Sequence, residues 1–317
     1  MHCRALTETG DSGLAILAIG RRFARLAPLI WRGRRASGEM TGRRTSKAFA
    51  FAGLLLAGVL IAAPVSAADG VTACKAAGTP FATVEALGAR DGATIRLADG
   101  REVRLAGVAA PGDMDGSPEM ARQGTAALDA LVAGRRVALH GSGSAADRYG
   151  RLLAQVTVEK TLLGNTWLQE ALVLAGAVRV APGAGAPDCA QPLLERERVA
   201  RANRAGLWRD GGFALQKAGS IGPLLAAAGR FAIVEGTVRR VGEAGGTLYL
   251  DFGRRYNRDF SIIVPREVQA AFAASGVDLR ALSGKPVRAR GVLFERGGPA
   301  VELRVPAALE LIGMDGA

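Results

Sequence analysis

Short apolar–polar alternations separated by turn residues run from residue 81 to residue 158, and this pattern restricts the fold more than any other feature of the sequence. Asp91-Gly92 and Asp99-Gly100 stand between alternating runs, where Asp-Gly is a strong hairpin signal. One run, residues 118–132, has the apolar spacing of a helix and is followed by Gly134. Five strands with one helix between the third and the fourth is the order of an OB-type barrel. The predicted strands are residues 82–87, 94–97, 102–105, 136–140 and 152–158.

A Gly/Ala-rich stretch separates this pattern from a second one. We predict a first domain over residues 68–210, completed by two helices, and a linker over residues 211–228. Residues 229–317 again show five strands with one helix, residues 266–274, after the third, which predicts a second, smaller OB-like barrel. The expected fold class is therefore mainly β with α, of the α+β type. The remaining predicted helices are residues 167–175 and 193–203, and the strands of the second barrel are residues 231–241, 247–252, 260–264, 287–294 and 300–305.

An unbroken apolar run, residues 48–63, follows a basic segment and precedes the small triplet Val65-Ser66-Ala67. This order is typical of a secretory signal. The run is shorter than the roughly 20 residues of a membrane-spanning helix, which favours a cleaved signal over an uncleaved anchor. We therefore predict that residues 1–67 are a leader, with Met40 as the start and cleavage after Ala67. The mature chain would then be periplasmic or secreted and would not span a membrane.

Removal of this leader changes the electrostatic balance of the chain. The leader holds 10 of the 41 basic and 3 of the 29 acidic residues, which leaves 31 and 26 and a net charge of +5. The mature chain is thus mildly basic, and its charge permits nucleic-acid binding without requiring it.

Two cysteines, Cys74 and Cys189, remain in the mature chain. In an oxidising compartment two cysteines can pair, and a bond across so long a loop typically stabilises by about 2–4 kcal/mol. The alternative is a pair of buried free thiols.

Three signatures occur in order in the first domain: Asp91-Gly92-Ala93-Thr94-Ile95, the segment VRLAGVAAP at 103–111, and the segment DRYGRLLA at 147–154. Gly206-Leu207-Trp208 closes the series. With these signatures, residues 81–208 resemble the staphylococcal nuclease (thermonuclease) family. The resemblance implies a five-stranded barrel with helices and a nucleic acid as partner.

In that family, as the resemblance implies, two aspartates hold calcium, a glutamate prepares the attacking water and two arginines neutralise the phosphate. A hard cation needs oxygen ligands, and the transition state of phosphodiester cleavage gains negative charge. The arginine positions match Arg104 and Arg151, and Tyr149 stands beside them as a candidate contact to the substrate. The three carboxylate positions are occupied by Ala93, Ala109 and Gly112. A methyl group cannot ligate calcium, so we expect no metal site, no cofactor and impaired cleavage.

Asp113, Asp115 and Glu119 follow soon after the second signature and are candidate substitute acids. If a shifted loop brought one of them to the arginines, the chain would be an active calcium-dependent phosphodiesterase. The other interpretation is a solvated acidic loop, which we favour because catalysis tolerates little misplacement.

In the second domain, Arg254, Arg255 and Arg258 alternate with aromatic residues between two predicted strands. OB barrels hold single strands through phosphate charge and base stacking, so these arginines are candidate contacts to nucleic acid. An ordinary polar loop, with Phe252 and Phe260 facing the core, is the alternative. The domain carries 13 basic and 10 acidic residues, so no strong field favours binding.

Taken together, these features lead to three hypotheses. The first is an exported protein that binds nucleic acid or another phosphate-bearing ligand and has lost or impaired nuclease activity. The second is the active calcium-dependent nuclease with relocated acids. The third is a scaffold of the cell envelope that contacts other proteins.

Overall fold

The computed structural model describes residues 74, 78–112, 117–141, 143, 145–161, 164–183, 187–209, 211–255 and 258–313. The predicted leader, with its apolar run at 48–63 and Met40, lies outside these residues. The described part belongs to one compact unit, residues 63–317. None of its helices is long and apolar enough to cross a membrane.

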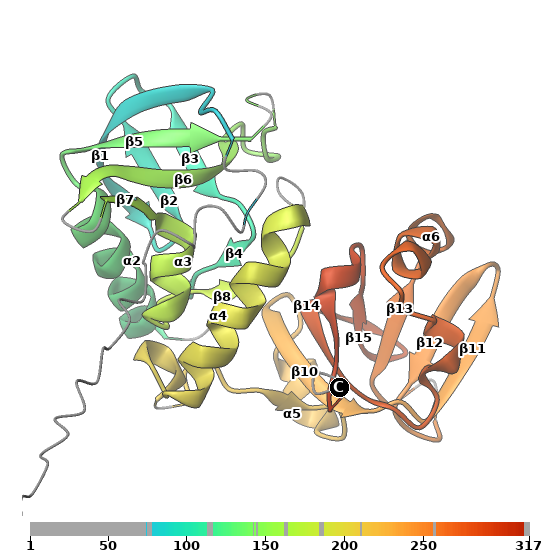
Figure 1. Cartoon of the computed structure of the whole chain (residues 1–317). Helices are drawn as coiled ribbons and strands as arrows, with labels where there is room; N and C mark the ends of the chain where they lie inside the picture. The colour runs from blue at the N-terminus through green and yellow to red at the C-terminus, as the bar shows by residue number, and fades with distance from the viewer. Residues whose placement is uncertain are drawn as a thin grey trace, which may run out of the picture. The chain divides into compact units, whose positions relative to one another are not determined.

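Residues 82–161 form a closed five-stranded barrel, which confirms the predicted fold of this region (Figure 1). Its hydrogen-bonded order is β3-β2-β1-β5-β6, and the barrel closes because β3 also pairs with β6 in parallel. The chain folds this way because the turns reverse it at each Asp-Gly and because alternate residues, such as Val103 and Leu105, are buried. The strands are β1 (Ala82–Asp91), β2 (Thr94–Leu97), β3 (Glu102–Leu105), β5 (Arg135–His140) and β6 (Leu152–Thr161).

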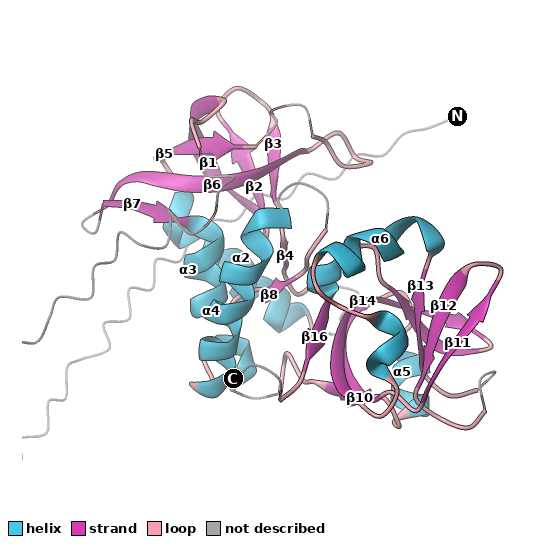
Figure 2. Ribbon diagram, turned by 45° about the vertical axis from the view of Figure 1, so that its right-hand side comes forward, coloured by secondary structure: helices cyan, strands magenta, loops and turns pink. Residues whose placement is uncertain are grey.

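Helices cover one end of this barrel, as Figure 2 shows for α2, α3 and α4. Helix α2 (Pro118–Val132) is capped by Ser117, whose hydroxyl accepts a hydrogen bond from the amide of Met120. The helix packs against β1, and its Leu128 is buried in the first core. Helices α3 (Leu168–Leu174) and α4 (Ala190–Ala202) follow. The sequence pattern did not reveal three short strands: β4 (Val108–Ala109), β7 (Gly164–Trp167) and β8 (Arg179–Val180).

The second strand-rich region has the same connectivity as the first. Its order is β11-β12-β13-β15-β14-β10, and only two residues separate β10 from β11, so the sheet returns to its starting strand. Strands β13 and β15 pair in parallel, as β3 and β6 do in the first barrel. The elements are β10 (Phe231–Thr237), β11 (Arg240–Ala244), β12 (Thr247–Asp251), β13 (Ser261–Val264), α6 (Arg266–Ala274), β14 (Pro286–Arg296), β15 (Gly298–Glu302) and β16 (Leu309–Leu311).

The segment expected to be a linker contains regular structure. Strand β9 (Gln216–Lys217) pairs in parallel with β10, and helix α5 (Ile221–Ala226) buries Leu224 in the second core. Single 3₁₀ turns complete the described elements: Pro187–Cys189, Gly206–Trp208, Leu279–Leu282 and Pro306–Ala308.

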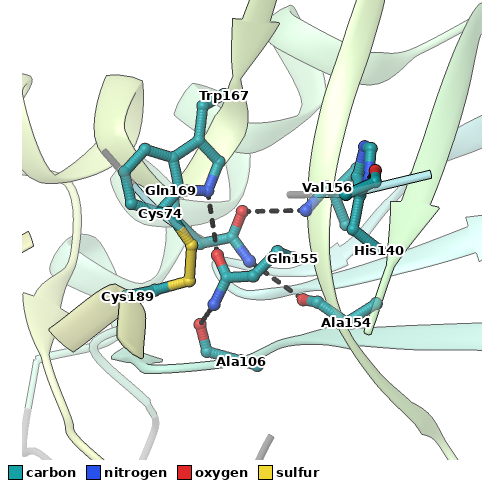
Figure 3. Close-up of a disulfide and its surroundings, with 10 residues drawn as sticks. Cys74, Ala106, His140, Ala154, Gln155, Val156, Trp167, Gln169 and Cys189 are labelled. Carbon is teal, nitrogen blue, oxygen red and sulfur yellow. Dashed lines mark hydrogen bonds between the residues drawn. A yellow bond between two sulfur atoms is a disulfide. The ribbon is translucent and has the colours of Figure 1, made fainter. Parts of the chain in front are cut away.

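A disulfide and a buried amide network fix the helices to the first barrel (Figure 3). The predicted bond between Cys74 and Cys189 is present, and both residues are buried in the first core. Gln155 on β6 accepts a hydrogen bond from the indole of Trp167 at 2.8 Å and donates to the carbonyl of Ala106 at 3.1 Å. Gln169 in the first turn of α3 accepts the amide of Val156 at 3.1 Å and donates to the carbonyl of Ala154 at 2.9 Å, so buried hydrogen bonds hold α3 against β6.

A buried ion cluster connects the two barrels. Arg290 on β14 donates to Glu197 on α4 at 3.0–3.1 Å and to the carbonyl of Val180 at 2.9 Å, and both charged side chains are fully buried. Glu310 is a second partner of Arg290, and interaction with Arg290 lowers the pKa of Glu310 although its burial alone would raise it.

Candidate functional site

Arg104 and Arg151 come together because their strands are neighbours. Arg104 lies on β3 between two core residues, so its side chain points away from the core. Arg151 immediately precedes β6, which pairs in parallel with β3, with Arg104 opposite Leu153. The pairing of two distant segments therefore places both guanidinium groups on one surface.

Asp91 lies between the two arginines and is the carboxylate that the structure brings to the pair. Its Oδ1 is 3.6 Å from Nη1 of Arg104, and its Oδ2 is 3.9 Å from Nη1 of Arg151. The same side chain accepts the amide of Ala93 at 2.9 Å, so it also supports the turn. Sequence reasoning assigned Asp91 to the turn alone, because its second role arises only when the barrel closes.

Neighbouring groups hold Arg151 in place. Its Nε donates to Asp147 at 2.7 Å, and its Nη1 donates to the hydroxyl of Thr94 at 3.2 Å. Desolvation alone would raise the pKa of Asp147, but hydrogen bonds from Arg151 and the amide of Tyr149 lower it overall. Burial of Arg104 lowers the pKa of its guanidinium, while the charge of Asp91 acts in the opposite direction. The site therefore presents two oriented cations with part of their donors exposed.

Tyr149 offers an aromatic surface beside these cations. Its residue is 66% exposed, which is unusual for so large a side chain. The guanidinium carbons of Arg148 and Arg151 lie 4.8 and 5.2 Å from the centre of its ring. This arrangement can stack a flat group and hold a phosphate next to it.

The three carboxylate positions of the resemblance do not fit a calcium site. Ala93 is fully buried in the core, so its side chain is a methyl group without access to the surface where a calcium ion would bind. Packing is also tight at the preceding residue, because a Cβ on Gly92 would come within 2.8 Å of the Ala110 methyl group. Ala109 is half-buried and Gly112 is exposed, and neither has a side-chain oxygen. Within the described ranges, no three His, Cys, Asp or Glu side chains gather as a metal site would require.

Of the candidate substitute acids, the structure describes one. Glu119 is in the first turn of α2, where it pairs with Arg122 and accepts a hydrogen bond from Gln123 at 3.1 Å. The hydrogen bond from Arg122 lowers the pKa of Glu119. Both of these partners lie on α2, the helix that carries Glu119. Asp113 and Asp115 lie outside the described residues.

In the second barrel, Arg254, Arg255 and Arg258 are exposed in the loop between β12 and β13. The loop closes on itself, because Asp259 accepts the amide of Arg255 at 2.8 Å. The rings of Phe252 and Phe260 pack 5.1 Å apart, with Phe260 fully buried. The two rings therefore serve the core, and the three arginines stay candidates for binding through charge.

Comparison with known proteins agrees with the geometry of the first barrel. Residues 102–210 match the family model described as staphylococcal nuclease homologue. The match includes Arg104 and Arg151 and extends through α4 to residue 210, the predicted end of the first domain. No curated protein matches the chain.

Proposed function

For a chain whose residues 102–210 form a staphylococcal nuclease-like domain, we propose a nucleic-acid or phosphate-binding protein in which cleavage is lost or impaired. A domain of this kind is associated with nucleic-acid binding or nuclease activity. Phosphate binding is supported by Arg104 and Arg151, which both lie within 4 Å of the Asp91 carboxylate. Loss of cleavage is supported by the buried Ala93 at the position of a metal ligand.

The position of Asp91 indicates how a phosphate would bind. Two guanidinium groups within 4 Å of one carboxylate lie close enough together to contact one small anion. Guanidinium forks bind phosphate through paired hydrogen bonds, whether or not cleavage follows. A phosphodiester would replace the long contacts to Asp91 with shorter ones, and Tyr149 would stack an adjacent unpaired base.

We also propose that the chain acts outside the cytoplasm, in the periplasm or after secretion. The apolar run at 48–63 supports this proposal, and so does the Cys74–Cys189 disulfide, since such bonds persist in oxidising compartments. A fusion of residues 40–67 to a reporter that is active only after export would test it directly.

Binding of a labelled 12-nucleotide oligo-dT to residues 68–317 tests the proposed phosphate site. We expect Arg104→Ala with Arg151→Ala to weaken binding and to reduce the dependence of log Kd on log salt, because two phosphate contacts are lost. Arg122→Ala, which removes an exposed arginine on α2, is the matched control. Equal affinity and salt dependence in the double variant and the wild-type chain would contradict the proposal.

A further inference from the structure

The outer face of the second barrel carries a groove of about 480 Å³. Its residues alternate along the strands with core residues: Tyr249 stands between Leu248 and Leu250, which are both buried in the core. Strands β11, β12, β13 and β15 lie side by side in this sheet and all contribute. The groove thus belongs to the sheet surface, apart from the loop that carries Arg254, Arg255 and Arg258.

The floor of the groove contains a buried carboxylate. Asp251 is 4% exposed, and its Oδ1 accepts the hydroxyl of Ser261 at 2.9 Å. Its Oδ2 accepts Nη2 of Arg240 at 2.8 Å, while the Arg240 side chain stays 64% exposed. A buried acid that anchors an exposed arginine fixes the guanidinium at the groove wall and leaves its other donors available.

An aromatic ring and a second cation lie on the same face. The guanidinium carbon of Arg296 lies 5.9 Å from the centre of the Tyr249 ring. Arg296 is exposed and forms no ion pair with any residue that the structure describes. Two small residues, Gly242 and Ala300, also line the groove and take up little of its space.

The charge around the groove favours an anion. Glu243 is paired with Arg280, and Asp251 is paired with Arg240. The positive charge of Arg296 is therefore not balanced by either acidic residue of the groove. A ligand with a flat ring and a neighbouring negative charge fits this arrangement. The outer face of an OB barrel around its second and third strands, which are β12 and β13 here, is also where such barrels receive oligonucleotides.

From these contacts we infer that the groove binds an unpaired nucleotide of single-stranded nucleic acid. The base stacks on Tyr249, and the phosphates contact Arg240 and Arg296. This site is separate from the pair Arg104 and Arg151, and it is present whether or not that pair binds phosphate. A single strand held at both places would contact both barrels.

The test uses residues 68–317, which contain every described residue, with Arg104→Ala and Arg151→Ala already introduced. Titration with fluorescein-labelled oligo-dT of 12 nucleotides then measures binding that does not depend on Arg104 and Arg151, and the Tyr249 variants isolate the contribution of the groove. Tyr249→Ala should weaken binding about 5- to 150-fold, the range found when one stacked base is lost. Tyr249→Phe should retain the affinity, since the ring alone is needed. Arg239→Ala, which changes a neighbouring exposed arginine that does not line the groove, should behave as the parent.

Three results would overturn the inference: no binding by the parent, equal binding by the Tyr249→Ala variant, or the same loss in the Arg239→Ala variant. A preference for duplex over single strand would also contradict it, because a paired base cannot lie on the ring. Failure of the phosphate site gives a different result, namely unchanged binding when Arg104→Ala and Arg151→Ala are first introduced.

Discussion

The two barrels share one strand order but present different chemistry. In the first, the parallel pairing of β3 with β6 places Arg104 and Arg151 on one surface with Asp91 between them. In the second, the equivalent pairing of β13 with β15 supports a groove lined by Tyr249. Connectivity therefore decides which strands become neighbours, and the residues at outward positions decide what a barrel can bind.

The largest predicted loss of stability follows from removing the ion pair between the two barrels. Arg290→Ala removes the main charge partner of the buried Glu197, which keeps a longer contact of 3.9 Å to Arg201. Breaking a buried ion pair typically costs about 3–5 kcal/mol. The tryptophans of residues 68–317, Trp167 and Trp208, both lie in the first domain. We therefore expect the urea midpoint measured by tryptophan fluorescence to fall, although the substitution is in the second barrel.

Arg304→Ala is the control for this experiment, because Arg304 is exposed and pairs with Glu302 of its own barrel. It should change the midpoint little. An unchanged tryptophan midpoint in Arg290→Ala would mean that the two barrels unfold independently.

The next largest predicted loss of stability concerns the first barrel, because the Cys74–Cys189 disulfide lies in its core. Cys74→Ser with Cys189→Ser should lower the free energy of unfolding by about 2–4 kcal/mol. Chemical denaturation of the double variant and the parent, without reductant, measures the difference. Equal stability, together with two titratable thiols in the parent, would show that the bond does not form.

Next in size is the difference between the two binding surfaces. Arg104→Ala with Arg151→Ala should lower the salt slope by about 1.4, because each phosphate contact on a single strand contributes about 0.7. Tyr249→Ala should lower the affinity with little change in slope, because a stacked ring releases no counterions. Oligo-dT titrations at several salt concentrations separate the two cases. Identical slopes in all variants would remove the distinction between the barrels.

The smallest effect is a pH dependence. The pKa values of Glu310 and Asp147 are lowered in the folded chain, so their stabilisation is complete above the unfolded pKa values and is lost as the pH falls through the folded ones. Urea midpoints should therefore decrease from pH 7 toward pH 3. Glu310→Gln should be less stable at pH 7 and lose less on acidification, and an unchanged pH profile would contradict this assignment.

The sequence predicted the fold class and the first barrel well, because its turns and alternations are local signals. Asp-Gly marks the hairpins of β1–β3, and the single helical run between β3 and β5 became α2. A predicted single strand at 231–241 is instead β10 and β11, which face different partners in the sheet. The chain changes its partner strand between β10 and β11 because the barrel closes there, and a local sequence pattern does not indicate this.

The candidate sites followed the same division. The pair Arg104 and Arg151 could be chosen from signatures, but the ion pairs of Asp91 to both depend on the pairing of distant strands. The groove of the second barrel could not be predicted, because Arg240, Tyr249 and Arg296 share a face only after the sheet forms. Sequence reasoning instead chose the loop arginines, whose proximity in the chain was visible.

The most direct test of the central claim compares binding with cleavage. Single-stranded DNA and RNA are incubated with residues 68–317 in calcium or in chelator, and both the bound fraction and the cut fraction are measured. Because Ala93 is buried and carries no ligand oxygen, we predict binding of equal strength in both conditions and no cutting. Calcium-dependent cutting that disappears in Arg151→Ala would contradict the account and identify the chain as a nuclease with relocated acids.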